Sequence, residues 1–237
     1  MAEDLPAWDQ VVEILKGVST ATLTTVLLKK GLRNVWMRNA QPIHPGVGRL
    51  VGRAFTLRFV PAREDLATPA SWASPTSTRA AIEAMPAGCI AVVDASGVAD
   101  AGIFGDILCS RMAARGVVAL VTDGPVRDLE GVLGTGLPVW CRGAAAPPSV
   151  AGLTFVGWQE PIGCGGVAVY PDDVIVADRD GAVLVPQALV GAVLEEASEQ
   201  ERMEAWIMEE VGKGVPLPGL YPMNSETKAR YEAERGK

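Results

Sequence analysis

The strongest constraint on the fold is a regular alternation of helix-like and strand-like segments between residues 77 and 141. The segment STRAAIEAM at 77–85 predicts a helix, and CIAVVDA at 89–95 is a short β-branched run that is typical of a strand covered on both faces. The same order follows twice more, with helices predicted over 106–115 and 126–133 and strands in VVALVTD and PVWCRG. Such alternation predicts an α/β sheet with helices packed on it.

The flanking regions predict helices at both ends of the chain and further strands between them. Two N-terminal helices are predicted in WDQVVEILKG and STATLTTVLLKKG, before a half-buried strand in GRAFTLRFVPA. After about residue 150, short apolar runs separated by Asp-rich turns predict a β-meander or hairpins, and a long helix is predicted over about 187–212. No stretch resembles a linker, so we expect one domain over 1–237, with N-terminal helices in about 1–40 and a C-terminal helix and tail in about 187–237.

Charge and hydropathy narrow the classes of partner. The formal net charge is -7, whereas a nucleic-acid footprint needs clustered Lys and Arg. No apolar run approaches the roughly 18 residues of a membrane helix, and MAEDLPAWDQ is acidic where a signal peptide is basic. We therefore expect a cytoplasmic protein that binds neither nucleic acid nor membrane. The four cysteines lie far apart in apolar surroundings, which predicts buried free thiols.

The residue types exclude most familiar catalytic constellations. A Ser-His-Asp or Cys-His unit would have to use His44, the single histidine, which lies between two prolines in QPIHPG and has a structural role as its simpler interpretation. GCGG at 163–166 lacks the strand-to-helix context of a phosphate loop and indicates tight backbone packing instead. A metal site would have to use carboxylates, carbonyls and water, which suits a hard cation such as Mg²⁺ or Mn²⁺.

A candidate anion site lies at the start of the helix predicted from residue 106. Gly105 belongs to the preceding loop, and Asp106 is of the type that caps a helix N-terminus. The amides of Ile107 and Leu108 fall in the first turn, where N–H groups have no partner within the helix, so we expect them to bind an anion. The alternative, in which Asp106 only caps the helix, stays open.

A second group of candidates follows the strand VVALVTD, in the loop DGPVRD. Loops at the carboxyl ends of strands are where open α/β sheets bind ligands. Arg127 offers a planar fork for a carboxylate, and Asp128 offers an oxygen ligand for a metal. The alternative, in which Arg127 and Asp128 only form a local ion pair with each other, stays open. An amide cradle, an arginine and two carboxylates together suit a 2-oxo acid bound with a divalent ion.

These residues resemble the signature of the RraA-like family. Its marker is an Asp, twenty intervening residues and then Arg-Asp, and here Asp106 is followed by residues 107–126 and then Arg127-Asp128. STATLTTVL, GRLVGRAFTL and GGVAVYPDDVIVADRDGAVLVP are also similar to family segments. The metal-dependent members are class II pyruvate aldolases that act on 4-hydroxy-4-methyl-2-oxoglutarate and 4-carboxy-4-hydroxy-2-oxoadipate.

The resemblance implies an α/β fold of the swivelling β/β/α type, assembled as a homotrimer or a dimer of trimers with sites at subunit interfaces. It implies that Asp128 binds the metal directly and that Asp106 binds it through water. Gly105, Asp106, Ile107, Leu108 and Arg127 would bind substrate, with Arg127 and Asp106 catalytic. A glutamate of a neighbouring C-terminal helix would approach the metal, and the candidates are Glu199, Glu201 and Glu204. Each of these is also readily explained as a solvated residue of the helix face.

The implied reaction is retro-aldol cleavage of a 4-hydroxy-2-oxo acid to pyruvate, a carbon-carbon lyase activity, with oxaloacetate decarboxylation as a side activity. Two departures weaken the substrate assignment: the family commonly has an Asp near the position of Thr25, and the extension PAREDLATPASWASPTSTR is typical of a longer subgroup. Two alternatives therefore stay open. One is a lyase, dehydratase or hydrolase that acts on a sugar-derived 2-oxo acid, and the other is a non-catalytic regulator of an RNA-processing enzyme.

Overall fold

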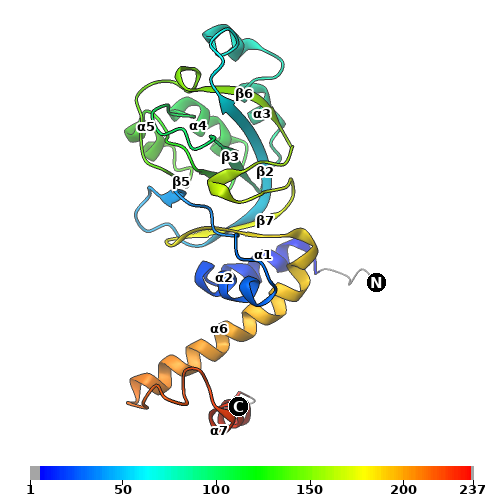
Figure 1. Ribbon diagram of the computed structural model, residues 1–237, viewed down its shortest axis with the longest axis vertical. Coiled ribbons are helices and arrows are strands. Elements are labelled where there is room, and N and C mark those ends of the chain that lie inside the picture. Colours follow the sequence, from blue (N-terminus) through cyan, green and yellow to red (C-terminus); the bar gives the residue numbers. More distant parts are fainter. Residues whose placement is uncertain (1–5, 236–237) are drawn as a thin grey trace.

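The computed structural model describes residues 6–235, and its centre is one mixed sheet of eight strands in the order β1-β5-β4-β3-β2-β7-β8, with β6 paired to β2 (Figure 1). The strands are β1 Gln41–Pro42, β2 Leu50–Pro61, β3 Cys89–Asp94, β4 Ala119–Thr122, β5 Val139–Cys141, β6 Leu153–Trp158, β7 Val174–Asp178 and β8 Gly181–Val185. Strands β2, β3, β4 and β5 pair in parallel, whereas β1, β6, β7 and β8 join antiparallel. The predicted α/β alternation is confirmed.

Three helices connect or follow the parallel strands and cover one face of them. They are α3 Thr78–Ala84, α4 Asp106–Ala114 and α5 Leu129–Gly134. Side chains alternate along β3, as the period of a strand requires: Ala91 and Val93 face this helical layer, and Ile90 and Val92 face a second core. Both sets are fully buried, which explains the continuous apolar run in the sequence.

The sheet curls into a nearly closed barrel. Strands β1 and β8 stand at the two ends of the strand order and are nevertheless in contact. Strand β2 is long enough to pair with β3, β6 and β7, and its register with β6 shifts between Arg58 and Phe59. The barrel interior is filled by apolar side chains and by Trp140, whose Nε1–H donates to the Asp178 carbonyl at 2.7 Å.

A second helical layer packs on the β7–β8 hairpin. It consists of α1 Trp8–Lys16, α2 Thr20–Lys29 and α6 Val190–Gly212, whose apolar residues form one buried cluster with Val174, Val176, Val183 and Val185. The second half of α6 extends away from this layer, and α7 Ser225–Glu234 folds back beside it (Figure 1). Both predicted N-terminal helices, the hairpin and the long helix are confirmed, whereas α7 was not predicted.

The short 3-10 turns are η1 Pro69–Ala73, η2 Ser149–Ala151, η3 Cys164–Gly166 and η4 Gln187–Leu189. Within residues 6–235, no single helix is long and apolar enough to cross a membrane. Helices α1 and α2 reach the length and hydropathy of a span only as a pair, and they meet at 107°.

Candidate active site

Two loops at the carboxyl ends of β3 and β4 meet beside the start of α4. The Arg127 amide donates to the Phe104 carbonyl at 2.9 Å, and the Ile103 amide donates to the Pro125 carbonyl at 2.9 Å. Gly102 allows this approach, because a Cβ at that position would stand 2.8 Å from the Arg127 amide nitrogen. The segment that precedes Asp106 is therefore fixed against the one that carries Arg127 and Asp128.

The structure places Asp106 at the first position of α4 and Gly105 at its N-cap, one residue from the predicted cap. The Asp106 carboxylate packs on α5, where a Cβ on Gly131 would lie 2.7 Å from Asp106 Oδ2. Asp106 Oδ1 accepts a hydrogen bond from the Ile107 amide at 2.7 Å. Asp106 thus gives one amide of the first helical turn a hydrogen-bond partner, and it also lines the pocket described below.

That hydrogen bond shows that one of the two amides predicted to bind an anion already has a partner. The Ile107 amide is engaged by Asp106, so it is not free to bind an anion. The Leu108 amide has no hydrogen-bond partner among residues 6–235, because it lies in the first turn of α4, where Phe104 precedes the helix. One backbone donor at the helix start therefore stays available, and the Ile107 side chain beside it is 79% exposed.

Arg127 and Asp128 form the local ion pair that the sequence left open, with Arg127 Nε 3.0 Å from Asp128 Oδ2. Only Nε takes part, so the two terminal nitrogens of Arg127 have no partner among the described residues. Asp128 has φ 51° and ψ 47°, the left-handed conformation that costs a non-glycine residue about 1–3 kcal/mol. Its carboxylate lies against Gly105, where a Cβ would approach Oδ2 to 2.6 Å. The backbone therefore holds this carboxylate beside the start of α4.

These residues line one pocket of about 310 Å³, which lies between α4 and the two loops. The predicted Gly105, Asp106, Ile107, Leu108, Arg127 and Asp128 all lie in its wall. The remaining wall was not predicted and comprises Trp72, Thr78, Arg79, Gly102, Ile103, Pro148 and Ser149. A lone tryptophan in the long extension after GRAFTLRFVPA was the available signal for the first of these residues.

The three candidate glutamates lie on α6 and do not line this pocket. Glu199 accepts from Arg202, Tyr231 and Arg235, Glu201 accepts from the Ser19 amide at 2.7 Å, and Glu204 accepts from Gln200. Burial raises the pKa of Glu201, but hydrogen bonds from Ser19 and Thr22 outweigh burial and lower the pKa below its ordinary value. In Figure 1, α6 lies at the opposite end of the molecule from α4 and α5, so within one chain these glutamates are remote from the site.

Other reactive side chains near the parallel strands are engaged elsewhere. Asp94 accepts from the Gly163 amide, and Asp123 accepts from the Gly165 amide. Gly165 lies so close to Arg38 that a Cβ on this glycine would stand 2.6 Å from the backbone nitrogen of Arg38. The predicted tight packing of GCGG is thus confirmed. All four cysteines are buried and free. Burial, and to a smaller extent the nearby Cys141 and Asp106, raise the pKa of the Cys109 thiol to about 12. This thiol therefore stays protonated near neutral pH, and the thiolate that would act as a nucleophile is scarce.

The residues of the pocket fit a hard divalent cation. Asp106 and Asp128 supply carboxylate oxygens, which Mg²⁺ and Mn²⁺ prefer. Each carboxylate packs against a glycine, Gly131 or Gly105, at which a side chain would come too close to it. Within residues 6–235, no group of three or more His, Cys, Asp or Glu side chains is arranged to hold a metal. One chain therefore offers two carboxylates, and the remaining positions would be filled by water or by another chain.

Comparison with known proteins gives a family and several relatives. The family model RraA-like, described as Aldolase/RraA, matches residues 20–184. A protein of Halalkalibacterium halodurans, whose name gives it as a proposed 4-hydroxy-4-methyl-2-oxoglutarate aldolase, is 33% identical over 124 residues, which cover 52% of this chain and 58% of that protein. The chain thus matches less than two thirds of the length of that relative.

Two solved structures share the fold along nearly their whole length. Streptomyces coelicolor RraAS2, titled an unusual member of the RNase ES inhibitor RraA protein family, superposes with a TM-score of 0.75 at 32% identity. The match covers 86% of this chain and 98% of RraAS2. An uncharacterized protein of Pseudomonas syringae superposes with a TM-score of 0.77 at 27% identity, covering 92% of this chain and 99% of that one.

Proposed function

Because the chain belongs to the RraA-like family, we propose that it is a divalent-metal-dependent class II pyruvate aldolase that cleaves a 4-hydroxy-2-oxo acid resembling 4-hydroxy-4-methyl-2-oxoglutarate. The observation that carries the proposal is that Asp106, Leu108, Arg127 and Asp128 line one pocket and that the Leu108 amide has no hydrogen-bond partner among residues 6–235. An anion-binding amide, a guanidinium and two carboxylates provide what a 2-oxo acid and a cation need.

Asp128 would hold the cation directly and Asp106 would hold it through water. A bound Mg²⁺ or Mn²⁺ would supply Lewis-acid stabilisation of the negative charge that develops on the pyruvate half. The terminal nitrogens of Arg127 would bind the 2-oxo oxygen and hold it in place as its charge grows. The Leu108 amide would bind the substrate carboxylate.

Cleavage requires that the C4 hydroxyl lose its proton, that C4–O become a carbonyl and that the C3–C4 electron pair pass into the pyruvate enolate. Protonation at C3 then gives pyruvate. The only histidine, His44, does not line the pocket, so a water held by Asp106 would accept the hydroxyl proton. Loss of CO₂ from oxaloacetate gives the same enolate, so a decarboxylase activity is expected beside cleavage.

The deciding experiment measures pyruvate release from 4-hydroxy-4-methyl-2-oxoglutarate and from oxaloacetate, with Mg²⁺, with Mn²⁺ and with EDTA. We expect release with either metal and loss of release with EDTA. Asp128→Ala should abolish metal-supported turnover, and Arg127→Ala should retain metal binding while it weakens 2-oxo acid binding. Equal residual activity in the two variants would contradict the roles assigned to them.

Two other candidate functions stay open, and the same assay separates them from the aldolase. RraAS2, at 32% identity, is titled a member of an RNase inhibitor family, which makes a non-catalytic regulator the second candidate. A regulator predicts no pyruvate from either compound under any condition. An enzyme for a sugar-derived 2-oxo acid predicts metal binding that depends on Asp128 without release of pyruvate from these substrates.

A further inference from the structure

A second guanidinium lies in the wall of the pocket that holds Arg127. Arg79, in the first turn of α3, lines this pocket together with Thr78 and Trp72. Its guanidinium carbon stands 5.0 Å from the centre of the Trp72 ring, within the range of a cation–π contact. The contact fixes a long exposed side chain at the pocket without neutralising its charge.

The carboxylate that Arg79 would be expected to pair with is occupied by two other arginines. Glu83 lies four residues further along α3, at the spacing of a helical ion pair. However, Arg111 binds Glu83 with both Nε and a terminal nitrogen at 2.8 Å, and Arg115 adds a contact at 3.2 Å. Within residues 6–235, Arg79 has no carboxylate within 4.0 Å, so its hydrogen-bonding fork is available to a ligand.

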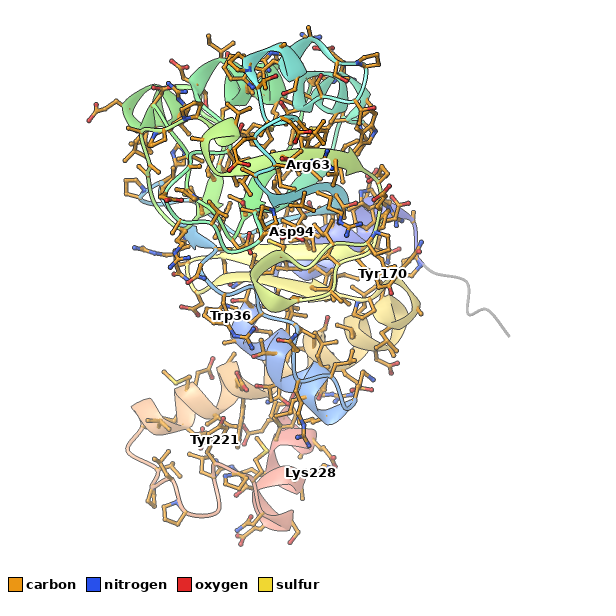
Figure 2. All side chains as sticks on the ribbon, turned by 45° about the horizontal axis from the view of Figure 1, so that its top comes forward. Trp36, Arg63, Asp94, Tyr170, Tyr221 and Lys228 are labelled. Atoms are coloured by element: carbon orange, nitrogen blue, oxygen red, sulfur yellow. The ribbon has the colours of Figure 1, made fainter. Side chains whose placement is uncertain are left out.

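Trp72 is carried to the pocket by the extension between β2 and α3, which forms the turn above β2 and β6 in Figure 1. The base of this extension is held to the strand layer, because the Ala62 amide donates to the Gly152 carbonyl at 3.0 Å and the Arg63 amide donates to Thr154 Oγ1 at 2.9 Å. Figure 2 shows Arg63 at this base. The turn η1 then presents Trp72, half-buried, to Arg79.

We propose that Arg79, stacked on Trp72, is the residue that binds the second carboxylate of the proposed substrate, on the half that does not become pyruvate, and that it thereby selects 4-hydroxy-2-oxo diacids over monoacids. This inference rests on the proposed aldolase function, whose substrate has two carboxylates, and assigns a residue to the second of them. Arg127 and the Leu108 amide hold the pyruvate end, and Arg79 is the other cationic group of the same pocket. A substrate with carboxylates at both ends therefore meets a donor for each.

The test compares cleavage of 4-hydroxy-2-oxoglutarate with cleavage of 4-hydroxy-2-oxopentanoate, in which a methyl group replaces the distal carboxylate. Wild type should prefer the diacid. Arg79→Gln should lower kcat/KM for the diacid by roughly tenfold to hundredfold, mainly through KM, because a charged hydrogen bond is lost. The ratio of the two kcat/KM values should fall by the same factor, and Trp72→Leu should lower it by less.

Arg33→Gln is the matched control, since it removes an exposed arginine that does not line the pocket. It should leave the ratio of the two kcat/KM values at the wild-type level. An unchanged ratio in Arg79→Gln, with the thermal midpoint of wild type, would overturn the inference and leave the aldolase proposal standing.

Binding of unreactive acids decides the inference even if no cleavage occurs. 2-Oxoglutarate carries the distal carboxylate and 2-oxopentanoate lacks it, and neither has a hydroxyl to start cleavage. Calorimetry with Mn²⁺ should give weaker 2-oxoglutarate binding for Arg79→Gln and a smaller change for 2-oxopentanoate. If wild type cleaves no substrate, the aldolase proposal fails. Equal 2-oxoglutarate affinity in wild type and Arg79→Gln would refute the role of Arg79.

Discussion

Glycines set the positions of both site carboxylates. Asp128 Oδ2 lies 2.6 Å from the place where a Cβ of Gly105 would stand, and Asp106 Oδ2 lies 2.7 Å from the place where a Cβ of Gly131 would stand. Real Cβ atoms do not approach oxygen so closely, so any side chain at these positions must displace the carboxylate. Displacements of about 1 Å can cost a factor of 10² in turnover.

Gly131→Ala should therefore lower turnover by roughly tenfold or more while the protein stays folded. The matched control lies on the same helix: a Cβ on Gly134 meets nothing within 4 Å, so Gly134→Ala should preserve turnover and stabilise α5 by up to about 1 kcal/mol. Steady-state pyruvate release and thermal unfolding of both variants provide the comparison. Equal turnover in the two variants would mean that the position of Asp106 does not matter.

The first turn of α2 is tied to the β7–β8 hairpin by Asp178. Asp178 accepts from the Thr20 hydroxyl at 2.6 Å, from the Thr20 amide at 3.0 Å and from Arg49 Nε at 3.3 Å. Burial raises the pKa of Asp178, and the hydrogen bonds from Thr20, Asp180 and Arg49 together outweigh burial, so the pKa lies below its ordinary value. The ionised carboxylate therefore stabilises the folded state.

Asp178→Asn should lower the free energy of unfolding by about 2–3 kcal/mol at pH 7. Because the folded pKa is depressed, this contribution is present above the unfolded pKa of about 3.9 and is lost as pH falls through the lower folded pKa. Urea titrations at pH 7, 5 and 3 should show a difference from wild type that persists to pH 5 and shrinks at pH 3. Asp100→Asn, at an exposed position, provides the control; a difference that grew at pH 3 would contradict the assigned sign.

The elements that could be predicted are those whose own residues determine them. The buried strands β3 and β4 and the helices α3 and α4 follow from apolar period and from caps such as Ser77, whose side chain accepts from the Ala80 amide. Helix α7 was missed because its sequence, SETKARYEAE, is almost wholly polar and it is held by tertiary contacts such as Trp206 against Tyr231. The Arg79–Trp72 contact likewise depends on how the extension folds over the strands, which no local pattern specifies.

At the scale of the whole molecule, the C-terminal segment projects from the compact body (Figure 1). It exposes large apolar side chains, namely Met208, Leu217 and Tyr221, at 69%, 54% and 57%. Figure 2 shows Tyr221 and Lys228 on this projection, well separated from Asp94 and Arg63 on the body. Exposed apolar groups on a projecting arm suit contact with another copy, and the resemblance to the RraA-like family implies a homotrimer or a dimer of trimers.

Complementation between inactive chains tests whether a neighbour completes the site. Asp128→Asn removes a pocket carboxylate, whereas Glu199→Gln, Glu201→Gln and Glu204→Gln alter α6, which is remote from the pocket of its own chain (Figure 1). If a neighbour supplies the glutamate in a ring of identical interfaces, one of the glutamate variants is inactive by itself. When that variant is reassembled at random with an equal amount of Asp128→Asn, a working site needs an intact Asp128 in one chain and an intact glutamate in the next. About a quarter of the sites should meet both conditions.

The measurement is pyruvate release after the two chains are dissociated together, reassembled and checked by light scattering for the mass of the native assembly. Refolding each variant alone is the control for recovery. Restored activity with one glutamate variant identifies the residue that reaches across the interface. Glutamate variants that are all fully active alone would show that the site is complete within one chain, with water in the remaining metal positions.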